Sequence, residues 1–395
     1  MKNNLYQEEK TYIVEKKNND NNIYKTNKRN YGIDLARIIS MILIINHHII
    51  FHGGPFSKTN KFSIQYQFLV FYNLICCSGV NVFGIISGCV CSFSYKFSNL
   101  FYLLFLTFFY NIIIALLFYY FQPKLKLDIK RFLYPLFISD YWYFNAYFLM
   151  YFFLPIINKG QSKVNKKTLK YCIINLFLIF SCLGEIKNYN KRFFLKDIFS
   201  LKRGFSYNWL LILYLYGSYF GKFRINNIIK RTYFYYIKLV IIIFLTAFIR
   251  MKIIIYNIHK NKQSIYLNVD YCCPSEVIIS ISIIMLFLNI NIKNKYLLKI
   301  ISFFAPLTYG VYLIHNHLLV RIRLIRKYFL FLTKLKASHL FLMEILCSLV
   351  IFLICSLIDF LRLLIFKFCK IRQIIIFILK ITTNIADKIF IFELF

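Results

Sequence analysis

The sequence predicts an all-α, polytopic integral membrane protein with about ten transmembrane helices. Hydrophobic residues make up 59% of its 395 positions and charged residues only 16%, whereas a soluble domain uses about a quarter of its residues for charge. The apolar residues occur in long runs separated by short basic stretches. A run of about 18 or more apolar residues crosses the hydrocarbon core as a helix, because lipid offers no hydrogen-bond partner to the backbone.

Ten apolar runs follow one another along the chain, and each predicts one span. The fourth, fifth and sixth runs are short, as expected of tilted helices or helices that extend beyond the run. Together the runs define a transmembrane domain over residues 31–367. They lie near 33–51, 68–93, 99–121, 141–157, 169–184, 205–221, 232–256, 275–290, 299–320 and 340–366.

The two ends of the chain differ from this domain. Residues 1–30 form a basic tail rich in Asn, Lys and Glu, which has too little apolar surface to fold alone. Residues 368–395 are apolar but interrupted by charge. This pattern is typical of an amphipathic helix on the membrane surface, and an eleventh span is the alternative.

Basic residues predict the orientation in the membrane. The tail up to Arg29 and the loop with Lys159 and Lys163 fall on the same side of a ten-span arrangement. The positive-inside rule makes that side the cytoplasm. The loop at 185–204 is equally basic and falls on the other side, so the N-terminal tail decides the prediction of a cytoplasmic N-terminus.

Several function classes are excluded by composition and motifs. The formal net charge of +35 is spread over nearly every loop, without the clustered basic patch that binds nucleic acid. No GxxxxGK or GxGxxG pattern occurs, which argues against an ATP-driven machine. The eleven cysteines form no paired CxxC motifs, so neither a metal site nor a bound cofactor is predicted.

The first predicted span holds the densest set of ionisable side chains, and such groups inside a membrane are costly enough to suggest a function. At about 100° per residue, one face of this helix carries Asp34, Arg37, His48 and His52, whereas His47 points roughly 80° away. Arg37 and His48 are separated by roughly 16 Å along the helix axis. We therefore expect both to face one interior space.

These residue types suit group transfer. Histidine accepts a proton near neutral pH, and as a general base it activates a hydroxyl for attack on an acyl carbonyl. The planar guanidinium of Arg37 suits a phosphate or carboxylate, and Asp34 lies one turn before it. The alternative is an interfacial ion pair between Asp34 and Arg37, with histidines that only cap the end of the helix.

The first span resembles the opening signature of the membrane acyltransferase-3 family, in which Asp, a short gap, Arg, ten residues and His follow one another. Asp34, Arg37 and His48 match this pattern, and His52-Gly53-Gly54 resembles the His-Gly-Gly that often follows. Later segments are similar to further family motifs in the same order. They are NVFGIISGC at 81–89, WYFNAYFLMYFFLPIIN at 142–158, WLLILYLYGSYFGKF at 209–223, YGVYLIHNH at 309–317 and DFLR at 359–362.

The resemblance implies transfer of an acyl group, most often acetyl, from acetyl-CoA or another acyl-CoA to a sugar hydroxyl. The acceptor would be a cell-surface polysaccharide or a lipid-linked glycan, and the enzyme would lie in the plasma (inner) membrane. Its partners would be the lipid bilayer, the acyl-CoA co-substrate and the saccharide, with no nucleic acid.

The same resemblance implies roles for individual residues. His48 would be the catalytic base, with Arg37 and Asp34 as donor-binding or supporting residues. Many members carry an Arg-x-x-x-Arg motif after the second span, but here that place reads SYKFS with Lys96 as its only cation, which implies a variant donor site. The acceptor cavity would be lined by His52, Trp142, Asn145, Tyr312 and His315.

Two alternatives remain open. A polysaccharide or small-solute transporter without catalytic activity would be equally apolar, although transporters commonly show inverted repeats and helices broken by Gly or Pro, neither of which is evident here. The second alternative is a family member that kept the fold and lost activity, which the missing arginine pair suggests.

Overall fold

The computed structural model describes residues 29–91, 95–122, 141–183, 185, 201–224, 232–260 and 270–393. Throughout these ranges the regular elements are helices and none is a strand, which confirms the all-α fold class. Residues 1–28 of the predicted basic tail lie outside the described residues. The division into tail, transmembrane domain and C-terminal segment stays a prediction.

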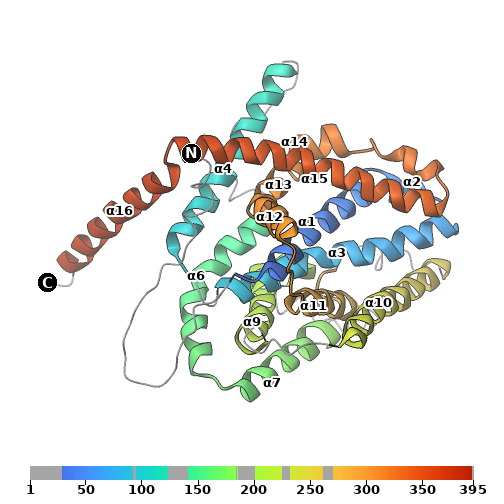
Figure 1. The fold of residues 1–395 in the computed structure, drawn as a ribbon, viewed down its shortest axis with the longest axis horizontal. Helices are drawn as coiled ribbons and strands as arrows, with labels where there is room; N and C mark the ends of the chain where they lie inside the picture. Colours follow the sequence, from blue (N-terminus) through green and yellow to red (C-terminus); the bar gives the residue numbers. More distant parts are fainter. Residues whose placement is uncertain are drawn as a thin grey trace.

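The helix that carries the candidate base lies at the centre of the molecule. This helix, α1 (Tyr31–His52), contacts α3 (Ile64–Cys91), α11 (Pro274–Leu288), α13 (Thr308–His315) and α15 (Ala337–Phe368) (Figure 1). Its start is capped by Asn30, whose side chain accepts hydrogen bonds from the backbone N–H groups of Gly32 and Ile33. The cap satisfies donors that a helix N-terminus otherwise leaves without partners.

The remaining helices surround this centre. The 3₁₀ turn η4 joins α12 to α13, so the predicted span near 299–320 is a broken helix that ends at His315. A π-helical turn, η2, continues α7. The other elements are α2 (Pro55–Lys58), α4 (Phe97–Phe121), α6 (Trp142–Lys163), α7 (Lys166–Leu176), η2 (Phe177–Cys182), η3 (Lys202–Gly204), α9 (Tyr207–Arg224), α10 (Tyr233–His259), α12 (Lys295–Phe304), η4 (Ala305–Leu307), α14 (Leu318–Val320), η5 (Arg321–Ile325), η6 (Leu330–Lys334) and α16 (Ile371–Glu393).

Six helical segments of the described chain are long and apolar enough to cross a membrane. The predicted number of ten is therefore not confirmed, because the predicted spans near 141–157, 169–184, 205–221 and 275–290 are helical but shorter or less apolar. The six segments are Tyr31–Lys58, Ile64–Val90, Phe97–Phe121, Tyr233–His259, Lys295–His315 and Ala337–Phe368.

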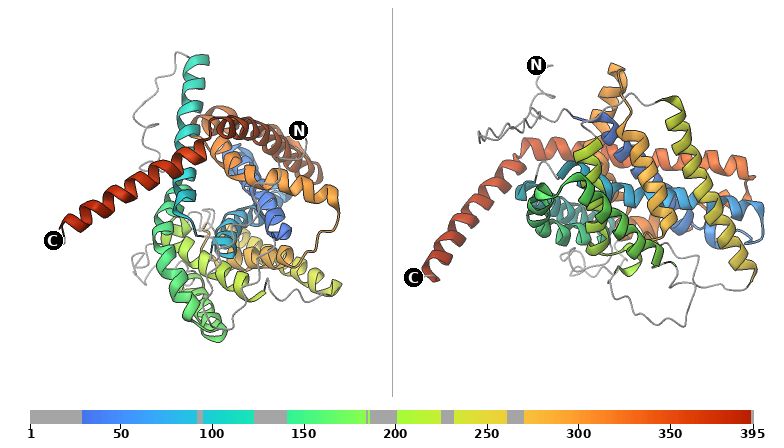
Figure 2. Two further views of the ribbon diagram at one scale, coloured as in Figure 1. Left: turned by 60° about the vertical axis from the view of Figure 1, so that its left-hand side comes forward. Right: turned by 90° about the horizontal axis from the view of Figure 1, so that it is seen from below.

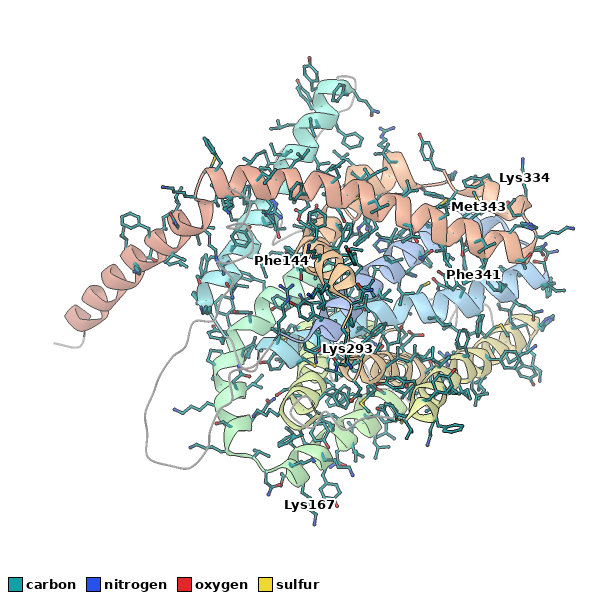
Figure 3. The ribbon with its side chains drawn as sticks, in the orientation of Figure 1. Phe144, Lys167, Lys293, Lys334, Phe341 and Met343 are labelled. Atoms are coloured by element: carbon teal, nitrogen blue, oxygen red, sulfur yellow. The ribbon has the colours of Figure 1, made fainter. Side chains whose placement is uncertain are left out.

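The outer surface of the long helices is apolar, as expected of lipid-facing helices. Large exposed apolar side chains follow one another along α10 and α15, far beyond what the surface of a soluble monomer presents. Examples are Phe244, Leu245, Phe248, Leu357 and Leu361. Figure 3 shows Phe144 in the interior and Lys167 and Lys334 at the edges of the molecule.

Helices α3 and α9 pack with their backbones in close contact, and small residues make this possible. A Cβ atom at Gly217 of α9 would lie 1.8 Å from the carbonyl oxygen of Ile85, and one at Gly88 of α3 would lie 2.1 Å from that of Tyr214. Small residues at helix interfaces are the usual means of close approach in membranes. The predicted motifs at 81–89 and 209–223 therefore meet at this interface.

Replacing Gly217 with alanine is expected to destabilise the protein by about 1–3 kcal/mol, the usual cost of overpacking, because the methyl group would force α3 and α9 apart. Thermal unfolding of the purified protein in detergent measures this effect. The matched control is Gly160→Ala on α6, where no atom lies within 4 Å of the added Cβ. Equal melting temperatures in the two variants would contradict the prediction.

The C-terminal helix α16 follows α15 after the turn at Cys369 and Lys370. It contacts α4 near its start, where the Arg372 guanidinium donates to the Asn99 side chain at 3.1 Å, and then projects away from the other helices (Figure 2). An apolar helix that extends from the bundle is compatible with a position on the membrane surface. That position stays a prediction.

Candidate functional site

A cavity lies beside α1 and includes an empty volume of about 480 Å³, of which part is open to the surroundings. Its lining is mostly apolar and aromatic with a few polar groups, as in small-molecule sites. Four helices and one loop contribute to its wall. The lining side chains are Met41, Ile44, His48, Val80, Phe83, Trp142, Tyr143, Tyr271, Tyr309, Tyr312 and Asn316.

One face of α1 forms a wall of the cavity. Met41, Ile44 and His48 recur at intervals of three and four residues, which places them on the same side of a helix, and all three line the cavity. Arg37 lies on this face one turn before Met41 but does not line the cavity. The structure therefore places the predicted base in a cavity wall and the predicted donor-binding arginine beyond its end.

The two nitrogens of the His48 ring differ in their surroundings. Nδ1 is buried without a hydrogen-bond partner, whereas Nε2 is not among the buried atoms that lack one, and the residue lines the cavity. The neighbouring His47 is buried and directed away, with Nδ1 2.8 Å from the side-chain oxygen of Asn73 on α3. Of the two adjacent histidines, only His48 is placed to contact a molecule in the cavity.

His315 lies next to His48. The centroids of the two rings are 5.1 Å apart, although the residues come from α13 and α1. Nδ1 of His315 donates to the backbone oxygen of Val311 at 2.6 Å, a bond within the same helix. The structure thus brings together two of the predicted site residues, with His315 beside the candidate base.

Aromatic side chains form another part of the cavity wall. The Trp142 ring stacks on the Tyr271 ring, with centroids 5.6 Å apart and an interplanar angle of 21°. Trp142 also contacts Phe205, with ring centroids 4.6 Å apart. These rings give the part of the wall that includes Trp142 and Tyr271 an apolar, aromatic surface.

Tyr271 was not predicted as a site residue, since it lies in the loop before α11. Its backbone oxygen accepts a hydrogen bond of 2.8 Å from the Asn81 side chain, and Asn81 in turn accepts one of 3.0 Å from the indole of Trp209. Asn81 and Trp209 begin two of the motifs noted in the sequence, but nothing in the sequence indicates that these motifs meet at Tyr271. Burial raises the pKa of the Tyr271 phenol well above its usual value, so the phenol stays neutral.

Helix α13 is held in place from two sides. The Tyr141 hydroxyl donates to the backbone oxygen of Leu313 at 3.0 Å, and the Tyr309 hydroxyl lies 2.8 Å from Oγ1 of Thr107 on α4. These bonds orient the face of α13 that presents Tyr312 and Asn316 to the cavity. The predicted acceptor residue Tyr312 therefore does line the cavity.

Six predicted site residues lie outside the cavity wall: His315, described above, and Arg37, Asp34, Lys96, Asn145 and His52. Arg37 pairs with Asp34 at 3.2 Å, and Asp34 also pairs with Arg29 at 2.6 Å, which is the ion pair of the alternative interpretation. Lys96 is exposed just before α4. The roles of Arg37, Asp34 and Lys96 in donor binding stay predictions. Asn145 and His52 do not line the cavity, although the His52 ring centroid is 5.5 Å from that of His48.

The two glycines after His52 allow a later segment to pack over the end of α1. The backbone N–H of Lys327 donates to His52 and that of Phe329 to Gly53. Gly54 has a φ of 110°, and a Cβ there would lie 2.6 Å from Cδ2 of Leu330. A residue with a side chain would be strained at this φ, so the His-Gly-Gly motif positions the segment that follows α14 against the end of α1.

A family comparison covers most of the chain. Residues 30–359 match the family model described as "Acyltransferase domain". No curated protein and no solved structure matches the chain. The matched residues begin at the N-cap of α1, end in α15 and include every side chain that lines the cavity.

Proposed function

The chain belongs to this family of membrane acyltransferases, and we propose that it transfers an acyl group, most simply acetyl, from acyl-CoA to a sugar hydroxyl. The acceptor is a cell-surface polysaccharide or a lipid-linked glycan, and the protein lies in the plasma (inner) membrane. The observation that carries the proposal is the position of His48 in the wall of a cavity lined mainly by aromatic and apolar side chains.

The reaction follows from this position of His48. Nε2 accepts the proton of the sugar hydroxyl as the oxygen attacks the thioester carbonyl carbon. The carbon–sulfur bond then breaks, and the leaving thiolate takes the proton back from Nε2. The mostly apolar side chains of the cavity wall offer few polar groups to hold water beside the thioester, which favours transfer over hydrolysis.

The cavity wall supports a saccharide acceptor. The stacked rings of Trp142 and Tyr271 offer an apolar face to the C–H groups of a sugar ring. The amide of Asn316 and the phenol of Tyr312 add hydrogen-bonding groups for its hydroxyls. A mostly aromatic wall with a few polar groups is suited to a ring that has an apolar face and a polar edge.

The donor phosphates are proposed to bind near the N-terminal end of α1. Helix α3 runs antiparallel to α1, because Asn73 lies opposite His47 and Gly79 lies opposite Ser40. The end of α3 and Lys96, which follows it, therefore lie toward the same end as Arg37. These two cations support a phosphate-binding role, and His48 lies deeper in the protein.

Acyl transfer is tested with purified protein in lipid vesicles, acetyl-CoA and a panel of saccharides. We expect saccharide-dependent release of coenzyme A, measured with a thiol reagent, and one added acetyl group on the saccharide, measured by mass spectrometry. Movement of an unmodified saccharide across the vesicle membrane, without thiol release, would contradict the proposal and favour the transporter alternative.

A further inference from the structure

Two buried imidazoles each have one nitrogen without a hydrogen-bond partner. They are Nδ1 of His48 and Nε2 of His315, in rings whose centroids are 5.1 Å apart and whose planes are tilted by 43°. His315 has no exposed surface. Buried polar atoms nearly always have partners, so two such atoms in adjacent rings call for a common explanation.

The proton positions on His315 follow from its neighbour. The backbone oxygen of Val311 only accepts hydrogen bonds, so Nδ1 of His315, 2.6 Å away, carries a proton. In a neutral imidazole the other nitrogen is then an acceptor. Nε2 of His315 therefore lacks a donor, and Nδ1 of His48 in the adjacent ring lacks a partner as well.

We infer that His315 is a positioning residue for His48, with its Nε2 accepting a hydrogen bond from Nδ1–H of His48 directly or through one water molecule. This arrangement holds His48 in the tautomer whose Nε2 lone pair faces the cavity. The inference rests on the proposed function for its catalytic consequence, but the tautomer itself is a property of the protein alone.

A neutral imidazole here takes the place that a carboxylate has in a Ser-His-Asp triad, where a third group sets the tautomer and orientation of the base. No Asp or Glu occurs in residues 35–127 or 277–343. This excludes a carboxylate from α1 beyond Asp34, from α3 and from α13. Helices α11 and α15 also pack against α1 and carry the buried carboxylates Glu276 and Glu344, but the imidazole that contacts the His48 ring from another helix is that of His315.

The contact with His315 does not change which bonds form and break in the acyl transfer. The hydroxyl proton moves to Nε2 of His48, the new bond joins the sugar oxygen to the acyl carbon, and the carbon–sulfur bond breaks. The sulfur then receives the proton from Nε2. The proton on Nδ1 stays between the two rings throughout, so His315 neither gains nor loses a proton overall.

The tautomer is tested by nitrogen NMR of the full chain labelled with ¹⁵N-histidine, since the chain has only seven histidines. A His48→Gln variant assigns the His48 signals. We expect the Nδ1–H tautomer in the wild type and a mixture of tautomers in His315→Leu. An Nε2–H tautomer of His48 in the wild type would overturn the inference. This measurement needs no acyl transfer, so it remains decisive if the proposed function fails.

Kinetics provide a second test. We expect His315→Leu to lower kcat on the order of 100-fold, with the KM values of donor and acceptor nearly unchanged, since only the orientation of the base is lost. In His315→Gln the side-chain oxygen restores an acceptor, and kcat should stay within about tenfold of wild type. Equal losses in both variants, at equal melting temperatures, would assign His315 a merely structural role and overturn the inference.

Discussion

Replacing His48 with alanine is expected to abolish acyl transfer while the protein remains folded in the membrane. General-base catalysis contributes roughly 10²–10⁴-fold to a rate, and His48 is the histidine whose ring lines the cavity. The hydrogen bond inferred for its Nδ1 joins only the His48 and His315 rings, so loss of the side chain should leave the packing of the helices intact. The measurement is the rate of acetyl transfer from acetyl-CoA by purified protein, with the melting temperature recorded in parallel.

The matched control is His47→Ala. This variant loses the hydrogen bond to Asn73 and the contact of Nδ1 with the Cys77 sulfur, which is 3.3 Å away. We therefore expect a lower melting temperature and only a small loss of rate. Full acylation by His48→Ala would remove the assignment of His48 as the base, and an equal loss of rate in both variants would remove the distinction between the two histidines.

Replacing Asp359 with alanine is expected to cost about 3–5 kcal/mol of stability, the usual effect of removing one partner of a buried ion pair. The Arg362 side chain is only 5% exposed and Asp359 is fully buried, with Nη2 of Arg362 2.6 Å from Oδ2 of Asp359. Without Asp359 the guanidinium stays charged, because arginine does not lose its proton in proteins. Thermal unfolding of the purified protein in detergent measures the loss.

The Asp359→Ala substitution is also expected to disturb the candidate site, through helix α13. Asp359 accepts a hydrogen bond of 2.6 Å from the Tyr110 hydroxyl of α4, and a Cβ at Gly310 of α13 would lie 1.9 Å from its Oδ1. The ion pair thus supports the helix that carries His315. The control is Arg372→Ala, whose contact with Asn99 is exposed and should change stability by no more than about 0.5 kcal/mol. Similar destabilisation in both variants would contradict the prediction that the buried Asp359–Arg362 pair stabilises the protein more than an exposed contact does.

Sequence patterns alone predicted the helical membrane class and the position of most helices. Apolar runs are a local property, since the length of each run and the absence of charge decide whether it can cross lipid. Helical phase is local too, and it correctly put His48 on a different face from His47. The number of spans was less certain, because the short runs depend on tilt and on neighbouring helices for their final length.

Family motifs in the sequence also predicted the acyltransferase class, which the match over residues 30–359 confirms. The motifs are informative because their order along the chain is specific even though each one is degenerate. They do not say which residues meet. Asn81 and Trp209 were parts of two separate motifs until the structure joined them through one hydrogen bond to position the loop with Tyr271.

The sequence by itself thus determined the class of protein, most of its helices and the face of α1 that carries His48, because apolar runs and helical phase depend on neighbours within a few turns. The tertiary structure alone decided that His315 lies against His48, that Tyr271 stacks on Trp142 and that Arg37 pairs with Asp34 outside the cavity wall. The first two contacts join residues more than a hundred positions apart. Only the packing of whole helices sets such distances, since helical phase gives a side chain a direction but no neighbour.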